Sequence, residues 1–265
     1  MPPTPDTLTI TPRYRPLFEA AGLTAQSLFT DPRIVVWRSI TERQNCTLDL
    51  PLDAGQSLRL HVKRFEPTRA AVSPAEEEAR GIAALEREGI PTAPLVAFGN
   101  HPDGRSVVVT EDLAGFRAGD KAVAAGLPFE SLLTPTADLA ARLHTQGLHH
   151  RDLYLCHFFV AANNDTDTAP QLRLIDAARV RPLPSLFTRT RWIVKDLAQF
   201  WYSTLSLPVT DDQRTRWLAR YAQSRSLSST DPLRRKIERK VASIARHDQN
   251  LKAAQPTRNV SIPGG

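Results

Sequence analysis

Residues 143–159 read LHTQGLHHRDLYLCHFF, and this stretch decides the fold. Apolar residues recur at helical spacing up to Leu143, and Gly147 follows as a turn residue. A polar triplet, His-Arg-Asp, stands at 150–152, and the apolar run at 158–160 is typical of a short buried strand. The stretch therefore predicts a helix, a polar turn and a strand in direct succession.

The polar turn resembles the catalytic loop of protein kinases, in which His-Arg-Asp is followed at the fifth position by a metal ligand. The fifth position after Asp152 is His157, where protein kinases carry Asn. With Leu143, His144 and Gly147 upstream, the loop is similar to that of the Kdo/WaaP family of lipopolysaccharide kinases, which phosphorylate sugars of the inner core. The resemblance implies an α+β, two-lobed protein-kinase-like fold. Its small lobe would hold an antiparallel sheet plus one helix, and its large lobe would be mainly helical.

Two segments after the loop fit the same layout. Residues 171–176 form an apolar strand that ends in Asp176, the counterpart of the aspartate in the kinase Asp-Phe-Gly motif. The chain continues with Ala-Ala-Arg at 177–179, so only the aspartate of that motif is kept. The apolar helix at 191–201 contains Asp196, which would be costly to bury without hydrogen bonds. The resemblance implies that Asp196 holds the backbone of the catalytic loop.

The segment before the loop predicts a small lobe. Alternating or β-branched runs at 34–37, 46–50 and 58–65 are typical of strands. Lys63 lies near the end of the third, where a kinase places the lysine that neutralises the nucleotide phosphates; an exposed strand-end lysine is the alternative.

A helix start follows at 73–78, with Ser at the N-cap, Pro at the first helical position and acidic residues in the first turn. Gly89 marks the predicted end of this helix. The resemblance implies that Glu78 orients Lys63, with Glu77 as the alternative.

Two further parts of the small lobe concern the nucleotide. The loop at 39–45 reads SITERQN and contains no glycine, so it cannot approach phosphates as closely as the Gly-rich loop of a kinase. How the phosphates are held is therefore left open, with backbone amides and Arg43 as candidates. Strands at 95–99 and 106–110 lead into Glu111-Asp112-Leu113. The resemblance makes this the hinge, so the backbone of Glu111 and Leu113 is expected to bind adenine.

The resemblance gives each polar residue of the large lobe a role. Asp152 is expected to be the catalytic residue that accepts or orients the proton of a sugar hydroxyl, and Asp176 to hold the metal that bridges the phosphates. Mg²⁺ prefers oxygen, so His157 is expected to bind metal weakly, to act through a water or to hydrogen-bond Asp152 or Asp176. His150 is expected to pack and stabilise the loop, and Arg151 to pair with an acid or a phosphate. The implied cofactors are ATP and Mg²⁺, with Mn²⁺ as an alternative.

Composition sets the range of partners. The 265 residues are 41% hydrophobic, enough for a real core, and carry a net charge of +6, which favours anionic partners. The resemblance selects an anionic glycolipid as acceptor rather than nucleic acid. Cys46 and Cys156 give no metal spacing, which fits a reducing cytoplasm. No apolar run approaches the roughly 20 residues of a spanning helix, and the N-terminus shows no secretory signal. We therefore expect a cytoplasmic protein with at most peripheral contact with the inner membrane.

The expected organisation is an N-terminal extension at 1–30, a small nucleotide-binding lobe at 31–112, a large catalytic lobe at 113–251 and a flexible tail at 252–265. The expected function is ATP-dependent phosphorylation of a Kdo or heptose hydroxyl of the lipopolysaccharide inner core. One alternative keeps the enzyme and changes the acceptor, as in aminoglycoside- or choline-type kinases or a protein kinase. The other is a pseudokinase that serves as a basic binding module, which the missing glycines and the Ala-Ala-Arg favour.

Overall fold

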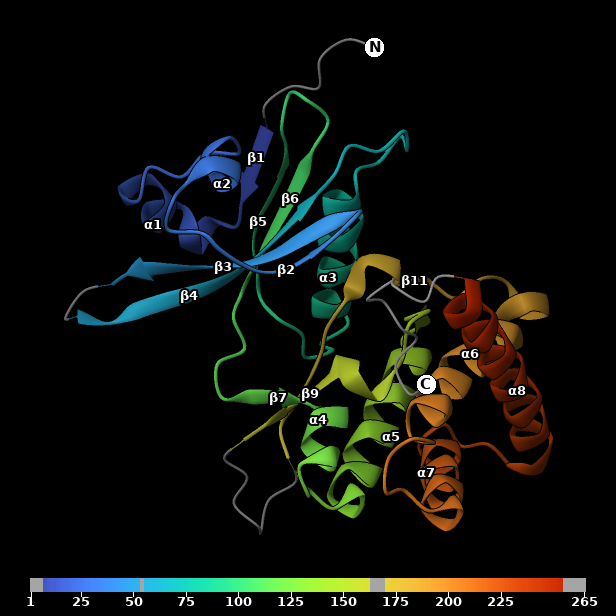
Figure 1. The fold of residues 1–265 in the computed structure, drawn as a ribbon. Coiled ribbons are helices and arrows are strands. Elements are labelled where there is room, and N and C mark those ends of the chain that lie inside the picture. Colours follow the sequence, from blue (N-terminus) through green and yellow to red (C-terminus); the bar gives the residue numbers. More distant parts are fainter. Residues whose placement is uncertain (1–6, 53–54, 163–169, 255–265) are drawn as a thin grey trace. The chain divides into compact units, whose positions relative to one another are not determined.

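The structure is a computed structural model that describes residues 7–52, 55–162 and 170–254 (Figure 1). The chain folds into two compact units. The first comprises Met1–Ala84 and Ala93–Ala114, and the second comprises Leu85–Thr92 and Gly115–Gly265.

The first unit is built on a six-stranded sheet in which every neighbouring pair is antiparallel, in the order β1-β5-β6-β4-β3-β2. Its strands are β1 (Thr7–Ile10), β2 (Val35–Ile40), β3 (Arg43–Pro51), β4 (Ser57–Phe65), β5 (Leu95–Asn100) and β6 (Ser106–Glu111). The strands expected from the sequence are present. The structure adds β1, which pairs with β5 and lies in the segment expected as an extension.

Side chains of the two sheet faces enter separate clusters, because successive residues of a strand point to opposite faces. Val107 and Val109 pack in a large cluster with Phe18 and Leu28, which come from α1 (Arg15–Ala20) and α2 (Ser27–Thr30). Val108, between them, packs on the other face with residues near and in α3 (Pro74–Arg87). Figure 1 shows α1 and α2 on one side of the sheet and α3 on the other. A short 3₁₀ turn, η1 (Pro12–Tyr14), precedes α1.

Helix α3 begins and ends as its sequence predicts. The Ser73 hydroxyl accepts a hydrogen bond from the Glu76 amide at 3.3 Å, and Pro74 is the first helical residue. After the helix, Gly89 has a φ of 64°, and the Ile90 amide donates to the Leu85 carbonyl at 2.8 Å. The positive φ therefore calls for glycine at this helix end.

The second unit is mainly helical. Its helices are α4 (Gly119–Ala124), α5 (Phe129–Thr145), α6 (Leu186–Ser203), α7 (Asp211–Ser224) and α8 (Asp231–Ala254). Helix α5 packs along α7, and α6 packs along α8 (Figure 1). The helix predicted to run up to Leu143 begins as early as Phe129 and contains Pro135. Helix α8 runs to Ala254, into the segment expected as a tail; the rest of that tail and residues 1–6 lie outside the described residues.

Two small sheets complete the second unit. One has the order β10-β9-β7, and the other pairs β11 with β8. Their strands are β7 (Phe116–Ala118), β8 (Leu148–His149), β9 (Phe158–Ala161), β10 (Leu172–Leu174) and β11 (Arg181–Pro182). Two 3₁₀ turns, η3 (Leu155–His157) and η4 (Ala177–Arg179), lie directly before β9 and after β10. The predicted sequence of helix, polar turn and strand is thus confirmed as α5, the segment from β8 through η3, and β9.

A buried aromatic group joins the helices beneath the loop. The rings of Phe200 on α6 and Trp217 on α7 stack with centroids 4.1 Å apart and planes at 9°. The Trp217 indole N–H donates to the Thr136 hydroxyl on α5 at 2.9 Å, so its polar atom is satisfied in the core. These contacts fix three helices around the segment that carries the polar residues. Among the described residues, no helix is long and apolar enough to cross a membrane.

Candidate active site

The side chain of Asp196 on α6 holds the loop at 150–152 through hydrogen bonds to its backbone. This carboxylate is fully buried and accepts hydrogen bonds from the backbone amides of His150, at 2.7 Å, and Arg151, at 2.8 Å. Burial alone would raise the pKa of Asp196, but the hydrogen bond and charge of His144 and the His150 amide outweigh it, so the pKa is lowered. The carboxylate therefore stays charged, and it fixes Arg151 in a left-handed conformation with φ 72°.

Helix α6 supports the rest of the loop with two residues that the sequence did not single out. The Gln199 side-chain oxygen accepts from the Leu153 amide at 3.3 Å, and the Ser203 hydroxyl accepts from the Leu155 amide at 2.9 Å. Asp196, Gln199 and Ser203 are spaced three and four residues apart, so they share one helix face. Polar residues at this spacing on an otherwise apolar helix were the signal that could have identified them.

His150 connects this loop to the strand that precedes Asp176. The ring is fully buried, and its Nε2 lies 3.1 Å from the Ile175 carbonyl, to which it donates. Burial lowers the pKa of His150 to about 4, so the imidazole is neutral at physiological pH. His150 therefore packs and braces the loop, as its sequence position suggested.

Asp152 projects from the loop into a mixed environment. Both carboxylate oxygens lie 3.1 Å from Arg179 Nη1, and Gln199 Nε2 lies 3.4 Å from Oδ1. Burial raises the pKa of Asp152, while the charges of Arg179 and Lys195 pull it down, and burial prevails. A carboxylate whose pKa is raised toward neutrality is a better general base than an ordinary aspartate.

Arg179 is a further residue of the candidate site that the sequence interpretation missed. The Ala-Ala-Arg that follows Asp176 was treated only as the loss of a kinase motif. In the structure these residues form the turn η4, which directs Arg179 back onto Asp152. A cation three residues after the predicted metal ligand was the available signal.

Asp176 and His157 lie together, as predicted. Asp176 adopts a left-handed conformation (φ 62°, ψ 56°) after β10, and its Oδ2 lies 3.5 Å from His157 Nε2. His157 Nδ1 lies 2.6 Å from the Asp152 backbone carbonyl, which can only accept, so Nδ1 must carry a proton. With Nδ1 carrying a proton, Nε2 is the ring nitrogen that faces the Asp176 carboxylate, and in the neutral tautomer it presents a lone pair there. Two acceptors that face each other fit a cation or a proton between them.

The donor set fits a metal ion only in part. Within the described ranges, no three His, Cys, Asp or Glu side chains gather into a metal site. One carboxylate and one imidazole are present at Asp176 and His157. Since Mg²⁺ is commonly bound through one or two carboxylates plus substrate phosphates and water, these residues suit a cation that arrives with a nucleotide.

In the first unit, Lys63 and Glu78 form the predicted ion pair. Lys63 Nζ on β4 lies 2.5 Å from Glu78 Oε1 on α3, and the side chains are only 13% and 4% exposed. The second carboxylate oxygen, Oε2, is buried without a hydrogen-bond partner among the described residues. Glu78, the first choice of the sequence interpretation, is therefore in position to orient this lysine.

The glycine-free loop and the predicted hinge are both closely tied to the sheet. Ile40 pairs with Arg43, which leaves Thr41 and Glu42 as the whole turn between β2 and β3. The Glu111 carboxylate accepts hydrogen bonds from the Tyr14 hydroxyl and Arg13, and the Glu111 amide donates to the Pro94 carbonyl at 3.0 Å. These contacts hold the hinge backbone in place before Leu113.

Arg151 was expected to pair with an acid or a phosphate, and its pairing with a phosphate stays a prediction. The described residues offer its guanidinium no acidic partner; instead it lies over the ring of Trp192, with Cζ 4.9 Å from the centroid. His149 packs on the same ring at 4.8 Å, and burial lowers the pKa of His149 to about 4. In this structure the Arg151 guanidinium is stabilised by a cation–π contact with Trp192.

Comparison with known sequences decides the family. A model of the lipopolysaccharide kinase (Kdo/WaaP) family matches residues 33–221, which include every candidate residue named above from Lys63 to Asp196. The chain belongs to this family. The two-lobed, protein-kinase-like α+β fold class predicted from the sequence is confirmed, with an antiparallel sheet and a helix in one unit and mainly helices in the other.

Curated relatives carry one description, lipopolysaccharide core heptose(I) kinase WaaP. The chain is 28% identical over 171 residues to the one from Pseudomonas aeruginosa, covering 60% of this chain and 63% of that protein. It is 27% identical over 175 residues to the one from Escherichia coli K12, and 29% identical over 177 residues to a second Escherichia coli protein; each match covers 62% of this chain and 64% of the relative. The chain thus spans just under two thirds of the length of these relatives.

Proposed function

We propose that this protein transfers the γ-phosphoryl group of ATP to a sugar hydroxyl of the lipopolysaccharide inner core, with heptose as the preferred sugar over Kdo. The observation that carries the proposal is the anchoring of the loop by Asp196. Asp196 holds the two backbone amides that directly precede Asp152, and His157 lies beside Asp176; both observations support Asp152 as the base and Asp176 as the metal ligand. The names of the family relatives support heptose as the acceptor.

The proposed chemistry assigns one task to each side chain. Asp152 orients the acceptor hydroxyl and takes its proton as the oxygen attacks the γ-phosphorus and the bond to the β-phosphate oxygen breaks. Such general-base assistance is typically worth about 10²–10⁴-fold. Lys63, held by Glu78, binds the phosphates that are not transferred. Asp176 and His157 hold the divalent cation, which neutralises charge on the phosphates when it is bound.

Arg179 controls the charge of Asp152 in this scheme. A buried carboxylate is a stronger base than an exposed one, but it must also be ionised to accept a proton. The guanidinium of Arg179, in contact with both oxygens, opposes the effect of burial and favours the ionised form. The side chain of Arg179 is 49% exposed, so it can move aside when a sugar hydroxyl approaches Asp152.

The remaining parts of the proposal concern the nucleotide and the location. The backbone of Glu111 and Leu113 binds adenine, and the protein acts at the cytoplasmic face of the inner membrane, where ATP is available, through peripheral contact. The Lys63–Glu78 pair supports nucleotide binding by the first unit.

An acceptor screen tests the proposed function. Purified protein, labelled ATP and Mg²⁺ are offered core glycolipid stripped of its heptose phosphates, free Kdo, free heptose, an aminoglycoside, choline and a peptide. We expect phosphate on the core glycolipid and, by tandem mass spectrometry, on its heptose. Preferential labelling of the aminoglycoside, choline or the peptide would contradict the proposed acceptor. Absence of ATP turnover by folded protein would favour the binding-module alternative.

A further inference from the structure

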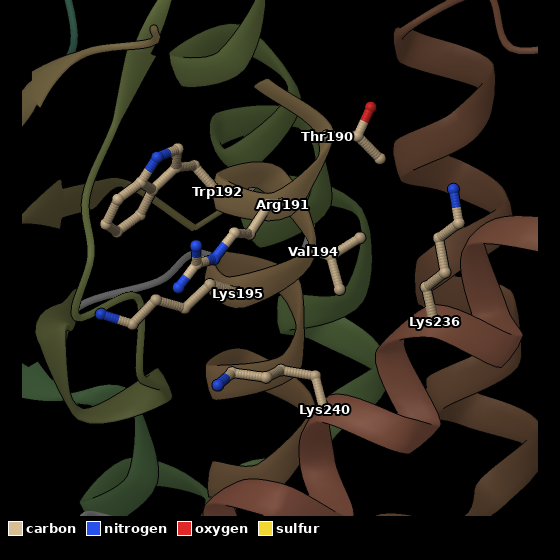
Figure 2. A pocket seen from close by; sticks show the side chains of 7 residues that line it. All are labelled: Thr190, Arg191, Trp192, Val194, Lys195, Lys236 and Lys240. Atoms are coloured by element: carbon tan, nitrogen blue, oxygen red, sulfur yellow. The ribbon is translucent and has the colours of Figure 1, made fainter. Parts of the chain in front are cut away.

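A pocket of about 510 Å³ lies between α6 and α8 in the second unit (Figure 2). Four of its lining residues are cationic, and none is acidic. They are Arg191 and Lys195 on α6, and Lys236 and Lys240 on α8. Its volume falls within the range of about 300–1,000 Å³ that is usual for pockets that bind small molecules or parts of larger ones.

The four cations share one cavity and have no carboxylate beside them. Within the ranges that the structure describes, none of the four forms an ion pair with a carboxylate. Several nearby basic residues are neutralised instead: Arg234 on α8 by Glu238, and Arg216 and Arg220 on α7 by Glu130 and Asp138. Exposed cations of α8 that do not line the pocket, such as Arg235 and Arg239, fit a solvated basic face, whereas the four pocket residues surround a single cavity.

Trp192 concentrates positive charge at one side of the pocket. Its ring centroid lies 5.7 Å from Lys195 Nζ and 5.9 Å from Arg191 Cζ, in addition to the 4.9 Å contact with Arg151. Each cation gains from the ring face, but the three repel one another. Burial and the charge of Arg179 lower the pKa of Lys195, a further sign that cations are crowded here. An anion would relieve this repulsion.

Lys195 links the pocket to the loop that carries the proposed base. It directly precedes Asp196, the anchor of the loop, and the charge of Lys195 acts on Asp152. In Figure 2, the side chains of Arg191, Lys195 and Lys240 extend to the same side. An anionic group bound by Lys195 would therefore lie on the helix that anchors the loop of Asp152.

We propose that the pocket between α6 and α8 binds an anionic oxygen group of the acceptor, a phosphate or a sugar-acid carboxylate, and so positions the adjacent sugar hydroxyl at Asp152. This inference rests on the proposed function and extends it to the mode of acceptor binding. Arg191 offers a planar donor pair to such a group, while the three lysines supply point charges.

The test removes the two pocket charges that are farthest from the loop in sequence. Lys236→Gln/Lys240→Gln is compared with Arg235→Gln/Arg239→Gln, which removes the same charge at the same spacing on α8 from residues that do not line the pocket. We expect the pocket variant to raise KM for the core glycolipid by about tenfold or more, with KM for ATP and kcat nearly unchanged. The control variant, Arg235→Gln/Arg239→Gln, should raise KM for the core glycolipid much less. Equal effects in both variants, or a rise in KM for ATP alone, would overturn the proposal.

Direct binding without ATP separates this inference from the proposed reaction. Calorimetry is performed with core glycolipid, with the same glycolipid after phosphatase treatment, with its carboxylates reduced, and with phosphatidylglycerol vesicles. The proposal is supported if one of the two treatments weakens binding to the unaltered protein and the pocket variant shows no such difference. The treatment that weakens binding then identifies the anionic group. Unchanged binding after both treatments, or equal binding to the vesicles, overturns the proposal. If glycolipid binds through Lys236 and Lys240 but is never phosphorylated, the proposed function fails while the binding site stands.

Discussion

The carboxylate of Asp152 is subject to two opposing influences. Burial raises its pKa, and Arg179, which contacts both oxygens, lowers it. Replacing Arg179 by Gln removes this opposing charge, so the pKa of Asp152 rises further. A general base works in its deprotonated form, and the acidic limb of the kcat/KM profile should therefore move to higher pH. Initial rates across pH measure this shift.

Arg173→Gln is the matched control for Arg179→Gln. Its guanidinium lies over the ring of Phe116, 5.9 Å from the centroid, and has no contact with Asp152 among the described residues. Its profile should coincide with that of the unaltered protein. If the acidic limb is the same in both variants, Arg179 does not set the charge of Asp152.

His157 combines a hydrogen bond with a proposed metal contact. Its Nδ1–H donates to the Asp152 carbonyl, and Nε2 faces Asp176. In His157→Asn the side-chain amide can donate to the same carbonyl and supply an oxygen toward the metal, which Mg²⁺ prefers. We expect Mg²⁺-dependent activity within about tenfold of the unaltered protein, whereas His157→Ala, with neither group, should lose far more. Inactivity of a folded His157→Asn protein would show that the imidazole itself is required.

At the scale of an element, α6 serves as the support of the loop. In Asp196→Asn, an NH2 group replaces one of the two carboxylate oxygens, so one of the two backbone amides that donate to Asp196 faces a donor, and the other donates to an uncharged oxygen. Hydrogen bonds to charged groups are worth about 1.5–3 kcal/mol each, so the free energy of unfolding should fall by about 3 kcal/mol. Chemical denaturation at neutral pH measures this change.

The pH dependence of that loss follows from the lowered pKa of Asp196. The charged form contributes fully above the unfolded pKa of about 3.9, and its contribution is lost as pH falls through the lower folded value. The difference in free energy of unfolding between the unaltered protein and Asp196→Asn should therefore be full at neutral pH and become smaller in strong acid. Asp248→Asn is the control: that buried carboxylate accepts from Tyr202, so its loss should cost stability without lowering kcat. A constant difference at all pH values would contradict a charged Asp196.

Elements were predictable where one local signal defined them. The caps of α3 and the alternation of β4 could be predicted because each depends on a few adjacent residues. Strand β1 was missed because four residues, Thr7–Ile10, give too short a pattern, and it is fixed by pairing with β5. The support given by Gln199 and Ser203 was missed because it depends on how α6 packs under the loop. Lys63 and Glu78 could be paired only through the family resemblance, since they are distant in sequence.

At the scale of the whole molecule, each of the two units carries a different set of the proposed functional residues. The first unit carries the Lys63–Glu78 pair, and the second carries Asp152, Asp176 and His157. Lys63→Met should raise KM for ATP by about tenfold to a hundredfold, because a charged contact to phosphate is lost. The single variant also leaves Glu78 buried without its partner, which costs about 3–5 kcal/mol. Steady-state kinetics at limiting ATP measures the first effect.

A second variant separates folding from nucleotide binding at this pair. Lys63→Met/Glu78→Gln removes both buried charges, so it should recover much of the lost stability and keep the raised KM for ATP. Thermal unfolding measures the recovered stability, and steady-state kinetics on the same samples measures KM for ATP. Normal KM for ATP in the stable double variant would show that Lys63 has no role toward the phosphates.

The central claim is that Asp152 carries the phosphoryl-transfer step, and Asp152→Asn tests it most directly. The amide keeps the shape of the side chain but cannot accept the proton. Single-turnover transfer to core glycolipid is measured together with nucleotide affinity by calorimetry. We predict a rate lower by about 10²–10⁴-fold with nucleotide affinity almost unchanged. A rate equal to that of the unaltered protein would contradict the account.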